Sequence, residues 1–276
     1  MDVHTHFMPT RLQEAVWAYF DAAGPLVGRP WPVAYRLPAE ERVARLRALG
    51  VRAFTALLYP HKPGMAPALN AWAVDFAART TGCIQTATFF PEPGAAAYLA
   101  AALADGARVA KAHLQVGGYD PRDPLLDPVW GQFADAQVPV VIHCGSAPTP
   151  GPATGSGPIA AVLARHPRLV LVIAHLGAPE YAEFLELAET YAGVHLDTTM
   201  VFTDFFSEVA PFPTPLLPRL LELAEKVLLG SDFPNIPHPY AHQLEVLAEL
   251  GLGDDWLRGV LWDNGARLLG VSPTLS

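Results

Sequence analysis

The chain has 276 residues, of which 51% are hydrophobic and 16% are charged, enough for one domain with a large core. The net charge of -9 is spread along the chain without a basic run, which argues against a nucleic-acid partner, and no apolar run reaches the roughly 18 residues of a membrane span. The N-terminus has no basic region followed by an apolar stretch, and the two cysteines suggest no disulfide framework, so we expect a cytoplasmic protein.

Strand-like runs alternate with helical patterns along the whole chain. The predicted strands cover residues 2–6, 51–59, 83–90, 108–116, 139–145, 169–177, 194–200 and 227–233. The predicted helices cover residues 10–23, 38–49, 68–79, 95–104, 125–136, 159–165, 180–191, 215–226, 240–250 and 256–269. This alternation predicts an α/β fold, a single (β/α)8 TIM barrel over residues 1–276, with an insertion after the first strand (24–38) and closing helices at the C-terminus.

Histidine and aspartate side chains recur at the carboxyl ends of the predicted strands. His4 and His6 alternate in the first strand, so both imidazoles project to the same face. His143, His175 and Asp232 each follow an apolar run in a later strand. A single histidine in such a run is usually a packed core residue, and an aspartate there is often a helix cap. The recurrence on four strands nevertheless predicts a metal site.

The fourth predicted strand carries three polar side chains on one face, Lys111, His113 and Gln115. We expect this face to line the interior of the barrel, and Lys111 and His113 are therefore candidate substrate contacts. The alternative is an edge strand with a solvated face.

Aromatic residues are frequent in two segments that follow strands. Trp31 lies in the insertion, and Phe202, Phe205 and Phe206 lie in the loop 201–215. A mouth lined by these side chains would favour a small cyclic or aromatic acid over a peptide or a polymer, and Trp31 is a candidate substrate contact.

Several motifs together resemble the amidohydrolase superfamily, and more narrowly its amidohydrolase-related branch, which includes aminocarboxymuconate semialdehyde decarboxylase. The resemblance rests on residues 2–7, the strands that carry His143 and His175, and the segments 230–234 and 261–270. It implies a barrel with one divalent metal ion, expected to be zinc, at its C-terminal mouth. The residues that it assigns as metal ligands are His4, His6, His143 and Asp232. It places His175 beside the metal-bound water as base and acid.

A site of three imidazoles and one carboxylate leaves a coordination position open, which is typical of catalytic zinc. A water in that position would become a nucleophile, and Asp232 could accept its proton while it binds the metal. We therefore expect a metal-dependent hydrolase that cleaves a C–N or C–O bond in a small, cyclic or aromatic, carboxylated substrate. The branch also contains non-oxidative decarboxylases, so a carboxy-lyase with the same residues is the alternative, although the chain is shorter than we expect for those enzymes.

Two further interpretations stay open. The run Lys111-Ala112-His113 is similar to the fourth strand of binuclear family members, in which a carboxylated lysine bridges two metals. We expect a single metal because an unmodified Lys111 is cationic and would repel a second one. The remote alternative is a barrel that binds an acidic small molecule without a metal. The expected partner is a small-molecule substrate, and self-association into a homodimer is left open.

Overall fold

Parallel strands form the centre of the computed structural model, which describes residues 1–272. They are β1 Phe54–Thr55, β2 Cys83–Ile84, β3 Thr86–Thr88, β4 Val109–His113, β5 Val140–His143, β6 Leu171–Ile173, β7 Val194–Asp197 and β8 Val227–Leu228. β1 pairs with β2, and β3 to β8 pair in chain order. Since Gln85 alone separates β2 from β3, both belong to the one strand predicted at 83–90. Residues 273–276 of the predicted domain lie outside the described residues.

Residues 2–6 occupy the place of the first predicted strand, but they form isolated bridges and no continuous strand. Asp2 pairs with Phe54, and Thr5 pairs with Phe233. The backbone N–H of Thr55 donates to the Asp2 carbonyl at 3.2 Å, and that of His6 donates to the Phe233 carbonyl at 2.7 Å. The stretch therefore lies between β1 and the segment after β8. All eight predicted strand positions are present, in the order of a (β/α)8 TIM barrel.

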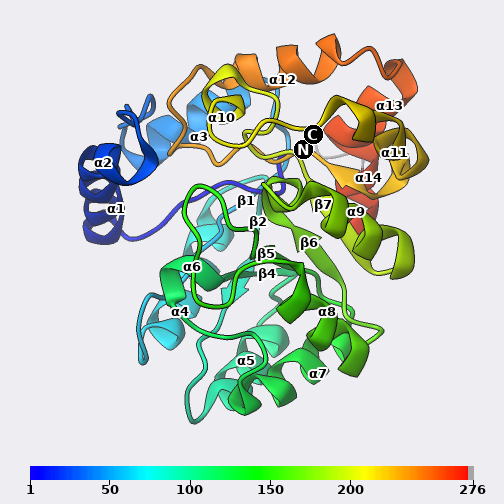
Figure 1. Ribbon diagram of the computed structural model, residues 1–276. Coiled ribbons are helices and arrows are strands. Elements are labelled where there is room, and N and C mark those ends of the chain that lie inside the picture. The colour runs from blue at the N-terminus through cyan, green and yellow to red at the C-terminus, as the bar shows by residue number, and fades with distance from the viewer. Residues whose placement is uncertain (273–276) are drawn as a thin grey trace.

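Helices surround the strands, and the two N-terminal helices lie to one side of them (blue in Figure 1). The helices are α1 Thr10–Ala22, α2 Gly24–Val27, α3 Ala39–Ala48, α4 Ala66–Arg79, α5 Ala95–Ala104, α6 Leu114–Gly117, α7 Asp127–Ala136, α8 Ser156–Arg165, α9 Tyr181–Thr190, α10 Asp204–Ser207, α11 Leu217–Glu222, α12 Tyr240–Glu249, α13 Asp254–Arg258 and α14 Asn264–Leu268. A π-helical turn, Gly259–Asp263, joins α13 to α14. Each predicted helix is present; α2, α6 and α10 were not predicted.

The predicted strands are all longer than the strands of the structure, and two of them run into helical turns. The fourth strand ends at His113, whose side chain accepts a hydrogen bond from the Val116 N–H at 3.3 Å and so caps the short helix α6. Gln115 is therefore in a helical turn and not on the strand. The sixth strand ends at Ile173, and a 3₁₀ turn that contains His175 follows it.

The interior of the barrel is apolar at the N-terminal ends of the strands. Val109, Val141, Val172 and Leu228 form one buried cluster there, together with Ala266 of α14. Because side chains alternate between the two faces of a strand, the next inward positions lie nearer the C-terminal mouth. The apolar cluster thus forms the floor beneath the polar residues of the mouth.

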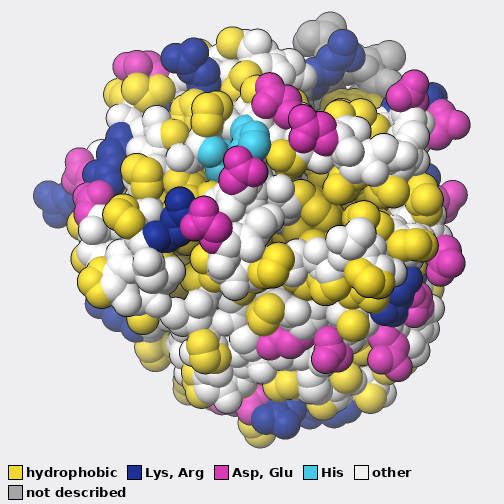
Figure 2. Space-filling model, turned by 45° about the horizontal axis from the view of Figure 1, so that its top comes forward, with side chains coloured by type: hydrophobic (Ala, Val, Ile, Leu, Met, Phe, Trp, Pro, Cys, Tyr) yellow, Lys and Arg dark blue, Asp and Glu magenta, His cyan; other side chains and the backbone are white. Residues whose placement is uncertain are grey.

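The surface in Figure 2 shows acidic and basic side chains interspersed among hydrophobic ones. Cys83 and Cys144 are both free, and Cys144 is buried. In residues 1–272, none of the helices is long and apolar enough to cross a membrane.

Candidate active site

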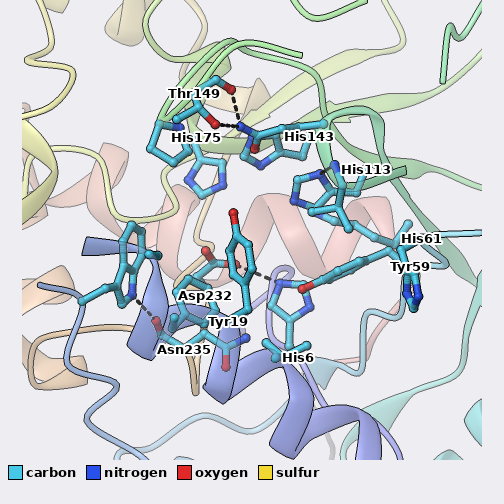
Figure 3. A pocket seen from close by; sticks show the side chains of 18 of the residues that line it. His6, Tyr19, Tyr59, His61, His113, His143, Thr149, His175, Asp232 and Asn235 are labelled. Carbon is cyan, nitrogen blue, oxygen red and sulfur yellow. Dashed lines mark hydrogen bonds and ion pairs between the residues drawn. The ribbon is translucent and has the colours of Figure 1, made fainter. Parts of the chain in front are cut away.

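A cavity of about 520 Å³ lies at the C-terminal ends of the strands, where parallel barrels place their active sites. Its polar end is lined by His4, His6, Lys111, His113, His143, His175 and Asp232. One side is formed by Leu12, Ala15, Val16, Tyr19 and Phe20 of α1, which we call the α1 wall. Figure 3 shows His6 and Asp232 on one side of the cavity and His143 and His175 on the other. The structure therefore brings together all the histidines and the aspartate that the sequence places at the carboxyl ends of the predicted strands, namely His4, His6, His143, His175 and Asp232.

The alternation along each strand explains this convergence. Lys111 stands two residues after Val109, and His143 stands two residues after Val141, so both extend the inward face of their strand above the apolar floor. Gly230 holds the matching position after Leu228. A Cβ at Gly230 would lie 2.8 Å from the Cβ of His4 and would also press on the Thr199 hydroxyl, so glycine leaves room for His4.

His4, His6 and Asp232 form a compact group of potential metal ligands. One atom from each lies within 4.8 Å of the other two, and within residues 1–272 this is the group that meets that criterion. Oδ1 of Asp232 lies 2.9 Å from Nε2 of His6 and 3.2 Å from Nε2 of His4.

Hydrogen bonds on the far side of each ring define which nitrogen carries the proton. Nδ1 of His6 lies 3.0 Å from the Leu57 carbonyl and must donate to it, and Nδ1 of His4 donates to the Asp197 carboxylate at 2.9 Å. In the neutral rings both Nε2 atoms therefore present lone pairs to Asp232. Two lone pairs and a carboxylate oxygen at these distances need a proton or a cation among them. The Lys111 ammonium contacts one of them, His4 Nε2, and the set of two imidazoles and a carboxylate fits a divalent metal.

Lys111 is the buried cation of the site. It is fully buried, and its Nζ lies 2.9 Å from Nε2 of His4, to which it donates. Burial lowers the pKa of Lys111 to about 8, although Asp232 and Asp197 oppose that shift. Burial, reinforced by the charge of Lys111, also lowers the pKa of His4 to about 4, so His4 is neutral at pH 7 and can act as a ligand.

His143 and His175 face each other, with ring centroids 4.8 Å apart, but they lie outside the compact group. Nδ1 of His175 donates to the Thr199 carbonyl at 3.0 Å, and Nε2 of His143 donates to the Ala147 carbonyl at 3.0 Å. The other nitrogen of each neutral ring therefore keeps a lone pair. Burial lowers the pKa of both rings below the usual value, which keeps them neutral. His113 stacks on His143 at 4.1 Å between ring centroids.

Asp197 is the residue whose role the sequence interpretation missed. It is fully buried at the end of β7, and it accepts hydrogen bonds from His4 Nδ1 and from the backbone N–H groups of His175 and Thr199. Burial would raise the pKa of Asp197, but His4 and these bonds hold it below the usual range. The signal was available, because Asp197 follows an apolar strand as Asp232 does.

Two site residues hold a strained backbone. His175 has a φ of 56° and Asp232 a φ of 70°, in the left-handed region that residues with a Cβ seldom adopt. Such strain persists only where surrounding contacts enforce it, and it concentrates at functional sites.

The prediction of an aromatic mouth is half confirmed. Trp31 and Phe206 line the cavity, and Phe206 stacks on His175 at 5.7 Å between centroids. Phe202 and Phe205 lie outside the lining, so for them the prediction is wrong. Phe202 packs on Phe212 instead, and Phe205 packs behind Trp31.

A family model described as amidohydrolase matches residues 1–271. The chain belongs to the amidohydrolase family. The resemblance drawn from its motifs is thereby confirmed. No curated protein matches this amidohydrolase significantly.

Solved structures share the fold of this amidohydrolase over nearly its whole length. An uncharacterised TIM-barrel protein of Bordetella bronchiseptica is 18% identical, with a TM-score of 0.76 and coverage of 98% of both chains. A probable 2-pyrone-4,6-dicarboxylic acid hydrolase of Acinetobacter baumannii with bound citric acid is 12% identical, with a TM-score of 0.63 and coverage of 98% of both chains. A 5-carboxyvanillate decarboxylase of Novosphingobium aromaticivorans with bound manganese is 12% identical, with a TM-score of 0.64 and coverage of 98% of this chain and 97% of the other.

At these identities the neighbours establish the TIM-barrel fold and not the substrate. They and the family comprise hydrolases and a decarboxylase, so this amidohydrolase is an enzyme.

Proposed function

We propose that the chain is a metal-dependent hydrolase that cleaves a C–N or C–O bond in a small, cyclic or aromatic, carboxylated substrate. The observation that carries the proposal is the convergence of His4 Nε2 and His6 Nε2 on the Asp232 carboxylate, at the polar end of the cavity. The bound manganese of the decarboxylase with the same fold is consistent with a divalent ion in such a barrel.

His4, His6 and Asp232 would hold the ion, and His143 is the predicted fourth ligand. When bound, a divalent ion supplies Lewis acidity, which polarises a carbonyl group and makes water a stronger acid. Zinc is the ion that we propose, because imidazole nitrogens and one carboxylate suit it.

His175 is the proposed base and acid. Its Nδ1 proton is committed to the Thr199 carbonyl, so Nε2 is free to take a proton from water and return it to the leaving group. The Thr199 carbonyl keeps the ring oriented throughout, and it can accept the Nδ1 hydrogen bond from the neutral ring and from the imidazolium alike.

Lys111 supports the choice of a carboxylated substrate. It is the single lysine or arginine among the cavity-lining residues of the described chain, and it lies at the polar end beside His4. A substrate carboxylate near this ammonium would be held with its ring toward the α1 wall. His113, which also lines this end of the cavity, is proposed as a further contact.

A substrate screen tests the reaction. Aromatic and cyclic lactones, esters and amides that carry a carboxylate should be hydrolysed by enzyme loaded with zinc or manganese, and chelation should abolish the turnover. The same preparation is assayed for carbon dioxide release from aromatic carboxylic acids. Metal-dependent carbon dioxide release without turnover of lactones, esters or amides would overturn the proposal in favour of a carboxy-lyase.

Metal content tests the assigned roles separately from turnover. His175→Ala should abolish turnover and leave one bound metal per chain, whereas His6→Ala and His143→Ala should lose the metal. Two metals per wild-type chain, with one lost in Lys111→Ala, would show that Lys111 is carboxylated and that the site is binuclear.

A further inference from the structure

The α1 wall presents an unpartnered apolar face to the cavity. Its residues are spaced so that they share one side of the helix, and all five are apolar or aromatic. Tyr19 is 57% exposed, and Leu12, Val16 and Phe20 are only partly buried by the rest of the chain. A partly exposed helix face at the mouth of a cavity offers hydrophobic contact area to a bound molecule.

Two aromatic side chains extend this apolar surface across the cavity. Trp31 donates its indole N–H to the Asn235 carbonyl at 2.7 Å, so its ring has no polar atom left for a ligand. Phe206 also lines the cavity, and its ring stacks on His175. A substrate body that lies among α1, Trp31 and Phe206 therefore meets mainly hydrocarbon and ring faces, together with the Tyr19 hydroxyl.

Arg11 of α1 does not line the cavity, and three other arginines near this part of the chain pair with groups outside it. Arg36 pairs with Asp21 on the surface, and Arg29 pairs with Glu208 at 2.5 Å and lies over the Phe205 ring. Arg42 is buried, and it donates to the Gln13 side chain at 2.8 Å. None of the three lines the cavity, so an anion at the α1 wall would be desolvated without a cationic partner.

We propose that the substrate is an amphipathic monoanion: it carries one carboxylate, held at the Lys111 end, and an uncharged apolar body that lies on the α1 wall, and dicarboxylates are excluded. The inference deepens the proposed function by limiting its substrate class. Complementarity of charge carries it, because the positive charge of Lys111 and of the proposed ion lies at one end of the cavity and apolar surface lies at the other, which matches a molecule with one charged end.

A matched pair of probes tests the inference by calorimetry at neutral pH on the metal-loaded protein. The probes are 3-propylbenzoate and benzene-1,3-dicarboxylate, which share a ring and one carboxylate and differ in the second substituent. The propyl probe should bind at least about tenfold more tightly, because the second carboxylate would lose its hydration against the α1 wall. Equal or tighter binding of the dicarboxylate, or no binding of either probe, would overturn the inference.

A charge placed on the α1 wall should alter this preference. In Val16→Arg the guanidinium would face the cavity, and the ratio of the two affinities should fall by about tenfold or more in favour of the dicarboxylate. Ala18→Arg is the matched control, since Ala18 is exposed on the same helix and does not line the cavity. Its ratio should equal that of the wild type, and a change as large as that in Val16→Arg would contradict the assignment of the wall.

The probe affinities test the inference about substrate class, and the substrate screen tests the proposed reaction, so either can be disproved without the other. A protein that prefers the propyl probe but hydrolyses no lactone, ester or amide would disprove the proposed function and leave the inference standing. A hydrolase that prefers the dicarboxylate probe would do the reverse.

Discussion

Asp197 acts on the site through other residues and does not line the cavity. Its Oδ2 accepts the Nδ1 proton of His4, and its Oδ1 accepts the backbone N–H groups of His175 and Thr199. The carboxylate thus selects the His4 tautomer that presents Nε2 to Asp232, and it also positions the strained turn at His175. A carboxylate in this position is a determinant of metal affinity.

Asp197→Asn should weaken metal binding by about 10- to 100-fold, because an asparagine can turn its NH₂ group toward His4 and remove the preference for the Nδ1–H tautomer. Metal affinity is measured by competition with a chelator. Asp127→Asn is the control, since Asp127 pairs with His166 and Arg165 away from the cavity. An unchanged affinity in Asp197→Asn would show that His4 does not bind the metal.

The strand-end pattern predicted which residues meet at the site because parallel strands bring their carboxyl ends to one edge and side chains alternate along them. It could not predict which rings would share one point. That depends on partners distant in the chain, such as the Leu57 carbonyl for His6 and the Ala147 carbonyl for His143. It also depends on the glycine at 230, which makes room for His4.

At the scale of elements, helices were predicted better than strands. The alanine-rich sequence of α5 gave its bounds, Ala95–Ala104, because alanine has the highest helix propensity and Gly106 follows the helix. The strands have two to five residues, too few to show where pairing stops, and local capping by His113 ends β4 early. The insertion 24–38 was expected to form a wall of the pocket, but it contributes only Val27 and Trp31 to the lining, and α1 supplies most of that side.

His195 makes β7 sensitive to acid. The ring is largely buried, and burial, with smaller effects of Lys226 and Arg267, lowers its pKa from the ordinary 6.5 to about 4. Between about pH 6.5 and 4, His195 is therefore protonated in the unfolded chain and neutral in the folded chain. The free energy of unfolding consequently falls as the pH drops through this range. By this linkage, His195 should account for about 2 kcal/mol of the loss between about pH 7 and pH 5.

His195→Gln should reduce that loss by about the same 2 kcal/mol, as measured by urea unfolding at the two pH values. His61→Gln, at an exposed position, should show the full loss of the wild type. An equal loss in His195→Gln and in the wild type would mean that other groups cause the acid sensitivity.

At the scale of the whole molecule, the first residues join β1 to the segment that follows β8. Asp2 accepts hydrogen bonds from the Ser231 hydroxyl at 2.6 Å and from the Tyr240 hydroxyl at 2.9 Å, and the N-terminal ammonium donates to the Leu261 carbonyl at 2.6 Å. The candidate metal ligands lie on the same two segments, since His4 and His6 belong to residues 2–6 and Asp232 follows β8. An ion held by them would therefore stabilise the junction between the first and last strand positions.

Metal removal should consequently lower the thermal stability of the fold. An ion that binds the folded chain at a free concentration about a thousandfold above its Kd contributes about 4 kcal/mol, which corresponds to roughly 10 °C in Tm for a domain of this size. Differential scanning calorimetry of the loaded enzyme, before and after chelation, measures the shift, and adding zinc back should restore the original Tm. His6→Ala should have a Tm that does not respond to zinc, whereas His166→Ala, whose ring pairs with Asp127 outside the cavity, should respond as the wild type does. A wild-type Tm that is unchanged when a stoichiometric metal is removed would show that the ion binds elsewhere than at the junction formed by His4, His6 and Asp232.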